Sequence, residues 1–318
     1  MAPRDAAIFC AAFGVEVMGN SRPESDPHGE LLGQNTLFRA MSDESLAEMF
    51  DASVVHIQER LSASKEVLLE VRGKRPRPHR DDKIIAAWNG LTIGALARGA
   101  RVLGMKNLAD AAQDAALFLK NELWDGRRLY RSYRGKRGNT EAFAVDYVFL
   151  IAGLIELHAV FPNSDWLEWA GELQRKLDSD FWDSEQVGYV VRPQVAGNTL
   201  LVMRDDYDGA EPSSNHMAAE NLLKLAALLD VPDHASRAES LLCAGSTLLE
   251  THSFAAPVLL AALDLQDRGV MKFQIPDNAE TRVLDKMRNC YFPRAVFTKG
   301  DGDEVIVCEG VTCRVFSA

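Results

Sequence analysis

Two copies of one helical hairpin pattern lie in the middle of the chain, and this repeat limits what the chain can fold into. The segments Leu123-Trp124-Asp125 and Phe181-Trp182-Asp183 follow similar predicted helices, and each leads into a turn that contains tyrosine. Their tryptophans lie 58 residues apart, and the helices expected to begin near Lys83 and Glu141 have the same offset. Such self-similarity indicates supersecondary units that bury their apolar faces by stacking on one another.

Apolar residues at helical spacing predict seven helices, most of them in pairs. They span residues 42–70, 84–104, 107–124, 141–160, 164–182, 213–229 and 234–249. Stacked hairpins form either an open solenoid or a closed ring of inner and outer helices. Small residues such as Gly90, Gly94 and Gly99 suit close approach of inner helices around an axis, which favours the ring. We therefore expect a mainly α fold, an (α/α) toroid of helical hairpins that is incomplete in this chain.

The pattern changes after residue 268, where short apolar runs replace the helical periodicity. Strands are predicted over residues 270–275, 295–298 and 304–307, with a helix over residues 278–291. We expect two domains from this change. The toroid would cover residues 1–268, with its N-terminal part missing, and a small α/β appendage would cover residues 269–318.

Five cysteines are few and odd in number for 318 residues, which argues against a fold held together by disulfides. Cys308 and Cys313 are separated by four residues, whereas the usual redox motif has a spacer of two. No second pair of ligands lies near them, so two structural thiols are favoured over a zinc or redox site. No metal or cofactor is predicted, and a reducing, intracellular compartment is the default expectation.

The charge balance excludes one class of partner. With 46 acidic against 35 basic residues, the net charge of -11 would repel a phosphate backbone, so no nucleic acid partner is expected. The basic run over residues 72–80 contains two prolines and no aromatic residue, and it is interpreted as a solvated linker. No run approaches the ~18 apolar residues of a membrane span, and the first ten residues do not resemble a signal peptide.

Three polar clusters lie at or just before the starts of the predicted inner helices. They contain His79, Asp81 and Asp82, then Asp146 and Tyr147, then Asp208, Glu211 and Asn215, with Trp88 and Asn89 further along the first inner helix. Because the inner helices of a toroid run parallel, their starts share one rim, and we expect these side chains to line one funnel. Carboxylates, amides and aromatic rings gathered in a funnel are what sugar binding and acid–base chemistry require.

Asp146 is the leading catalytic candidate, because it lies inside the predicted helix and not at its first position, where acidic residues serve as caps. Asp82, with Asp81 beside it, is the expected partner, since paired carboxylates divide the acid and base roles of glycoside cleavage. Trp88 and Tyr147 are expected to stack on a sugar ring. The expected substrate-binding set is completed by Asn89, Asn215, His79, Asp208 and Glu211. Helix capping is the alternative interpretation for each polar residue.

Histidine is the alternative general base, which a sugar epimerase would use to remove a proton beside a carbonyl. His79 and His216 lie near the proposed rim. The sequence contains neither a Gly-rich phosphate loop nor a nucleophile-elbow motif, so phosphoryl transfer and triad hydrolysis have no support. Epimerase-like activity, glycosidase-like activity and plain carbohydrate binding all stay open.

Several motifs resemble the spermatogenesis-associated protein 20 family. They are the run from Arg75 to Leu91, which includes His79-Arg80-Asp81-Asp82-Lys83, and the segments 141–157, 207–213, 29–37 and 308–313. The resemblance extends from about residue 5 to residue 314. It departs at Ser213-Ser214-Asn215-His216, where the family pattern has Ser-Gly-Asn-Ser, so His216 is not treated as a family residue.

The resemblance implies a thioredoxin-like domain followed by a six-hairpin, glycosidase-like toroid related in shape to the sugar 2-epimerases. This chain resembles the C-terminal part only, as a fragment of such a protein would. It has no Cys-x-x-Cys motif, so redox activity of the thioredoxin-like domain is not carried over. The family resemblance indicates a fold more firmly than a reaction.

Two kinds of function remain. One is a carbohydrate-active or carbohydrate-binding toroid of carbohydrate metabolism, whose partner is a small carbohydrate. The other is a non-catalytic helical scaffold that acts in spermatogenesis, as the family name indicates. An incomplete ring would expose inner helix faces, so a protein partner or a second copy is expected to cover them.

Overall fold

The computed structural model describes residues 1–22, 24, 26, 28–193 and 202–317. The chain forms two compact units, Met1–Asp81 and Asp82–Ala318, and each is described by itself. The division expected from the sequence, after residue 268, lies inside the second unit and remains a prediction. In the described part of the chain, every helix is too short or too polar to pass through a lipid bilayer.

The first unit contains three helices around a small apolar core. These are α1 (Pro3–Phe13), α2 (Asp43–Met49) and α3 (Val54–Gly73). The core consists of Ile8, Phe9, Ala12, Leu46, Ile57 and Leu61. The single helix predicted over residues 42–70 was wrong, because the chain turns at Asp51, whose φ of 47° is left-handed. The Ser53 side chain then accepts a hydrogen bond from the His56 N–H and starts a new helix.

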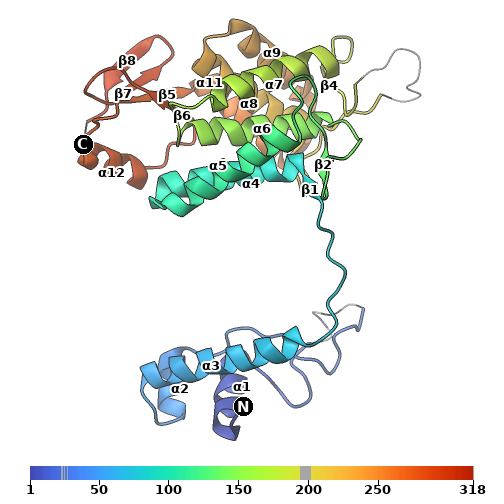
Figure 1. Ribbon diagram of the computed structural model, residues 1–318, viewed down its shortest axis with the longest axis vertical. Coiled ribbons are helices and arrows are strands. Elements are labelled where there is room, and N and C mark those ends of the chain that lie inside the picture. Colours follow the sequence, from blue (N-terminus) through green and yellow to red (C-terminus); the bar gives the residue numbers. More distant parts are fainter. Residues whose placement is uncertain (23, 25, 27, 194–201, 318) are drawn as a thin grey trace. The chain divides into compact units, whose positions relative to one another are not determined.

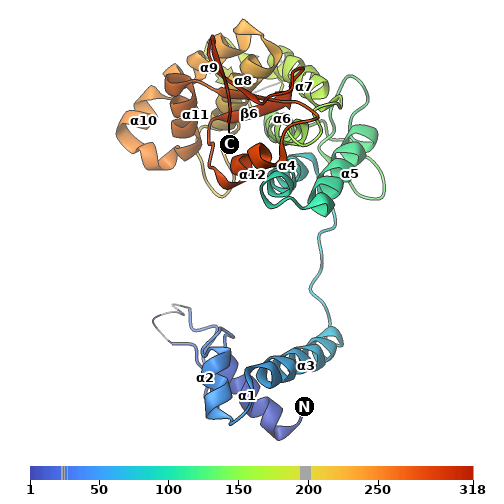
Figure 2. The same ribbon diagram turned by 90° about the vertical axis from the view of Figure 1, so that its left-hand side faces the viewer.

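The second unit is built of helical hairpins (Figures 1 and 2). Its helices are α4 (Ala86–Leu103), α5 (Lys106–Glu122), α6 (Ala144–His158), α7 (Trp166–Phe181), α8 (Ser214–Leu229), α9 (Pro232–Ala244), α10 (Ser246–His252), the 3-10 helix η2 (Ser253–Ala255) and α11 (Pro257–Arg268). The inner helices α4, α6, α8 and α11 pack one against the next, and α5, α7 and α9 pack behind them. The predicted fold of helical hairpins is confirmed, although the helix expected over residues 234–249 is divided at Gly245.

Helices α4 and α6 run parallel with the offset found in the sequence. Arg98 donates a hydrogen bond to Glu156, which lies 58 residues further along the chain. The helices approach very closely where Gly90 faces Gly153, since a Cβ atom added to Gly153 would lie 2.3 Å from the Gly90 carbonyl oxygen. The small residues of the inner helices therefore permit contact between the two backbones. Burial of apolar surface between the helices stabilises this contact.

Each repeated Trp segment ends in a small antiparallel ribbon. Strands β1 (Ile84–Ile85) and β2 (Ser132–Tyr133) form one ribbon, which joins the start of α4 to the turn after α5. Strands β3 (Trp182–Asp183) and β4 (Gly188–Tyr189) form the other after α7. These ribbons hold the starts of the inner helices.

The C-terminal residues form a four-stranded sheet in the order β6-β5-β7-β8. Its elements are β5 (Met271–Ile275), α12 (Thr281–Asn289), β6 (Ala295–Lys299), β7 (Ile306–Glu309) and β8 (Thr312–Val315). The pair β5–β6 is parallel and the other pairs are antiparallel. The predicted small α/β region is confirmed, but β8 was not predicted.

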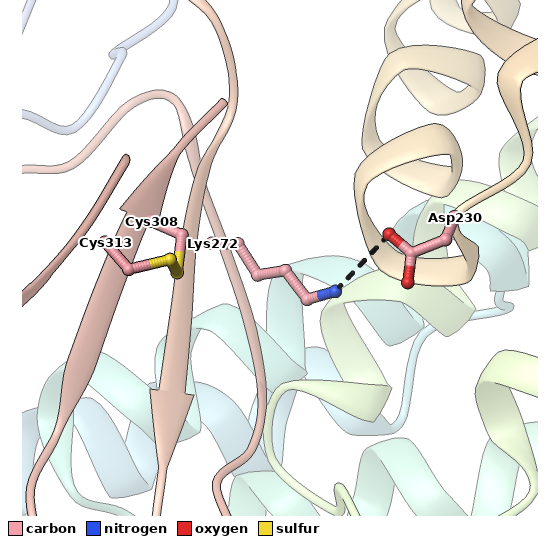
Figure 3. Close-up of a disulfide and its surroundings, with 4 residues drawn as sticks. All are labelled: Asp230, Lys272, Cys308 and Cys313. Carbon is pink, nitrogen blue, oxygen red and sulfur yellow. Dashed lines mark ion pairs between the residues drawn. A yellow bond between two sulfur atoms is a disulfide. The ribbon is translucent and has the colours of Figure 1, made fainter. Parts of the chain in front are cut away.

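A disulfide joins the last two strands (Figure 3). Cys308 and Cys313 face each other directly in the β7–β8 register and are bonded, so the expectation that they are two structural thiols was wrong. A tight hairpin brings positions five residues apart into opposition, a relation that motif spacing alone does not reveal. Lys272 lies opposite Cys308 on β5, and its ammonium group reaches to 4.0 Å from Asp230 at the end of α8.

Candidate functional site

The starts of three inner helices of the second unit lie together at one rim. The Ala87 N–H at the start of α4 donates a hydrogen bond of 3.1 Å to the Asp146 carboxylate near the start of α6. The Trp88 indole N–H donates one of 2.6 Å to Glu211, which lies just before α8. Trp88 is 53% exposed, so about half of this residue remains accessible at the rim.

Asp146 is fully buried and ties the rim together. Its carboxylate accepts hydrogen bonds from the backbone N–H groups of Ala87 and Phe143, and it pairs with Arg131 at 2.9 Å. Burial raises the pKa of Asp146 against the opposing effects of the backbone hydrogen bonds and of Arg131. These contacts give Asp146 a structural role, and its catalytic role remains a prediction.

Tyr147 and Asn215 are also buried and bonded within the protein. The Tyr147 hydroxyl accepts a hydrogen bond of 3.0 Å from the Leu129 N–H, and burial raises its pKa to about 12. The Asn215 amide accepts from the Tyr189 N–H and donates to the Tyr189 carbonyl, at 2.7 and 3.0 Å. Tyr147 therefore fixes the turn after α5, and Asn215 fixes β4 on α8.

Asp208 joins the start of α8 to the start of α11. It accepts hydrogen bonds of 2.8 Å from the backbone N–H groups of Ser213 and Val258. His216 Nδ1 lies 3.1 Å from the same carboxylate, within ion-pair distance but outside hydrogen-bond geometry. Both side chains are almost completely buried.

Two other predicted residues of the second unit, Asp82 and Asn89, do not converge with these. Asp82 is exposed and pairs with Arg134 at 2.6 Å. The Asn89 amide donates to the Ile85 carbonyl of its own helix start. His79 and Asp81 are exposed residues of the first unit. Of the predicted set, Trp88 and Glu211 are therefore the pair whose polar groups meet at the rim.

A groove of about 640 Å³ runs between α4, α6 and α8, and no predicted residue lines it. Its small residues include Gly94 and Ala95 of α4 and Ala152 and Gly153 of α6. Its polar side chains are Arg98, Glu156, Glu220, Asn221 and Lys224. Trp88 lies on the same exposed stripe of α4 as Ala95 and Arg98, at seven and ten residues' distance.

The polar side chains of the groove form one charge cluster around Glu156. This carboxylate accepts a hydrogen bond of 2.6 Å from Arg98 and lies 3.8 Å from both Lys224 and Arg101. Lys224 also pairs with Glu220 at 2.7 Å. Burial alone would raise the pKa of Glu156, but Lys224 and the two arginines outweigh it, so that the pKa is lowered. Glu156 is therefore an ionised acceptor at neutral pH.

The repeat offset in the sequence could have located part of this cluster, whereas the search for polar residues at helix starts could not. The 58-residue offset that relates Trp88 to Asp146 also relates Arg98 to Glu156. Among the described residues that line the groove, none is a histidine. The groove can therefore bind hydroxyl groups through charged acceptors and donors. Its described lining offers no histidine that could transfer a proton.

Comparison with known proteins identifies sequence relatives. No family model matches the chain. Spermatogenesis-associated protein 20 from Homo sapiens is 35% identical over 306 residues, and the mouse protein is 34% identical over the same length. Each match covers 92% of this chain, which spans 39% of the length of those relatives. An uncharacterized protein from Caenorhabditis elegans is 32% identical over 285 residues, 87% of this chain and 39% of its own length.

Two solved structures are partly similar. The GH76 alpha-mannanase BT2949 of Bacteroides thetaiotaomicron gives a TM-score of 0.49 at 11% identity, over 59% of this chain and 54% of its own. Cellobiose 2-epimerase from Bacillus thermoamylovorans gives a TM-score of 0.43 at 17% identity, over 52% of this chain and 45% of its own.

Proposed function

This chain is a homologue of spermatogenesis-associated protein 20 over part of that protein's length, and we propose that the groove between its inner helices binds a small carbohydrate. The observation that carries the proposal is the charge cluster of Glu156, Arg98, Lys224 and Glu220 in a groove of about 640 Å³. A volume of this order suits a small ligand. The cluster supplies acceptors and donors side by side.

The chemistry of a sugar matches this lining. Each hydroxyl group both donates and accepts, so a carboxylate beside an ammonium or guanidinium group satisfies both functions. Glu156 and Glu220 would accept from hydroxyl groups, while Lys224 would donate to them. The exposed ring of Trp88, one turn before the groove on the same face of α4, would stack against an apolar sugar face.

Binding has more support than glycoside cleavage. A glycosidase needs one protonated carboxyl group that donates to the leaving oxygen. Glu156 has a lowered pKa and is ionised, and the buried Asp146 carboxylate is occupied by three donors. Neither is placed as a general acid, so hydrolase-like or epimerase-like catalysis stays a further prediction.

Titration with monosaccharides and disaccharides tests the proposal, with heat of binding and tryptophan fluorescence as readouts. Trp88 is the most exposed of the five tryptophans, so a sugar at the rim should change the emission. We expect saturable binding, and we expect Ala95→Phe to weaken it at least tenfold by filling the groove. Ala95 is exposed, so this change leaves the core and the ion pairs intact.

Ala111→Phe is the matched control, because Ala111 is an exposed alanine on the outer helix α5. It should bind as tightly as the wild type. A wild-type chain that gives no response to any sugar, or an Ala95→Phe variant with unchanged affinity, would refute the proposal.

A further inference from the structure

We infer a second ligand site, lined by other residues than the groove, where the helical hairpins meet the C-terminal sheet: it binds a small organic carboxylate with an apolar body. The site is a cavity of about 420 Å³ within the second unit. The ends of α4 and α6 and the start of α5 line one side, and α12 and β6 line the other. Cavities between packed substructures are common places for small-molecule sites.

Most of the cavity wall is apolar. It includes Met105, Ala109, Val160, Leu284, Met287 and Phe297. Transfer of an aliphatic chain from water to such a surface is favourable by roughly 25 cal/mol per Å² of buried apolar area. The lining therefore suits a ligand with a hydrocarbon chain and not a polyhydroxylated ligand such as a sugar. This preference distinguishes the cavity from the groove.

Arg101 supplies the charge that selects an anion. Its guanidinium lies over the Phe297 ring, 4.2 Å from the centroid, and both residues line the cavity. Its Nε–H is buried and has no hydrogen-bond partner. The contact of its Nη2 with Glu156 is 3.8 Å, which is too long for a hydrogen bond. The guanidinium is thus held in place by stacking, and no side chain or backbone group in the described part of the chain accepts a hydrogen bond from its Nε–H.

An unsatisfied cation in this position costs stability. Burial lowers the pKa of Arg101 more strongly than Glu156 raises it, so its surroundings do not fully compensate the charge. A carboxylate in the cavity would take the free donors in the planar, two-pronged geometry that guanidinium favours. The ligand would therefore supply the close acceptor that Arg101 lacks, since its ion pair with Glu156 is too long for a hydrogen bond.

The other charged residues of the lining do not compete for that role. Lys106 pairs with Asp110 and Arg288 pairs with Asp285, and both ion pairs are exposed. Asp277 is the one acidic residue among those lining the cavity, and Lys299 holds it at 2.8 Å. Arg101 is consequently the cation of the lining whose ion pair is the longest and whose Nε–H has no hydrogen bond.

The test is titration of the full chain with decanoate below its micelle concentration, followed by calorimetry and by NMR of the arginine Nε–H resonances. Decanol supplies the apolar body without the charge, and acetate and inorganic phosphate supply charge without the body. We expect decanoate to bind saturably and to shift one Nε–H resonance, with the other three compounds at least tenfold weaker. In Arg101→Met that resonance should be lost and decanoate affinity should fall at least tenfold, with unchanged or higher thermal stability.

Arg237→Met is a closely matched control. Arg237 is also 28% exposed, lies 4.4 Å from the centroid of the Trp182 ring and is 3.7 Å from a carboxylate, but it does not line the cavity. It should retain full affinity. Leu284→Trp, which fills the cavity and keeps Arg101, should also abolish binding. The inference would be overturned if decanol bound as tightly as decanoate, or if Arg101→Met or Leu284→Trp kept the wild-type affinity for decanoate. It would also be overturned if Arg237→Met lost as much of that affinity as Arg101→Met.

Discussion

The Asp146 carboxylate connects the first turns of two inner helices, and this explains why an acidic side chain is completely buried. It occupies the third position of α6, where a carboxylate can accept from the backbone N–H that precedes the helix. Its second oxygen reaches the Ala87 N–H at the start of α4. Both helix starts thus rely on one side chain for donors that would otherwise be unsatisfied.

Asp146→Asn should destabilise the second unit by about 2 kcal/mol at pH 7, because an amide nitrogen would face donors where an oxygen accepted them. Burial raises the pKa of Asp146 above its ordinary 3.8, so the folded protein binds this proton more tightly than the unfolded chain does. Its stabilising contribution is therefore complete below pH 3.8 and declines as the pH rises through the folded-state pKa.

Urea unfolding of the wild type and of Asp146→Asn at several pH values measures this dependence. The loss of unfolding free energy caused by the substitution should be larger at about pH 4 than at pH 7. The opposite trend would mean that Arg131 outweighs burial and lowers the pKa.

Helices and strands were predictable where one local signal dominated. Gly104 ends α4 in the left-handed conformation, and the Ser213 side chain caps α8, as expected from residue type. Local signals failed where the chain bends without glycine, as at Asp51, and where pairing depends on register, as in the β7–β8 hairpin. The start of α6 was expected three residues too early, which made Asp146 resemble an interior residue.

The contact between α4 and α6 depends on the absence of a side chain at Gly90. A Cβ atom there would lie 2.5 Å from the backbone of Phe149, so Gly90→Ala must push the helices apart and should cost about 2 kcal/mol. Gly94→Ala, one turn further along α4, is the control, since its Cβ would lie 3.4 Å from Gly153. That control should be neutral or up to about 1 kcal/mol more stable, through its higher helix propensity.

Chemical unfolding of both variants measures the two changes in unfolding free energy. Equal stability of Gly90→Ala and Gly94→Ala would show that the two helices can separate without loss. The comparison removes helix propensity from the result, because both substitutions are made in the same helix.

The groove is a property of the assembled chain, and this is why its residues escaped prediction. The repeat offset could pair Arg98 with Glu156, but it does not extend to the third hairpin. Lys224 lies 68 residues after Glu156, because the connection before α8 is longer than the one before α6. Sequence periodicity thus locates two walls of the groove, and packing of α8 supplies the third.

The two compact units each have their own buried core, so the second should stay folded when it is separated from the first. Every core cluster draws its residues from one unit, and residues 76–83 between them are exposed and form neither strand nor helix. Brief trypsin treatment should cut the bonds Lys74–Arg75, Arg80–Asp81 and Lys83–Ile84, while the Arg–Pro bonds at residues 75 and 77 resist. Mass spectrometry should then find a stable fragment that begins at Asp81 or at Ile84. Its circular dichroism should be helical and should show one cooperative thermal transition. Continued degradation of that fragment, or a broad transition, would instead show that the hairpins need residues 1–80 to fold.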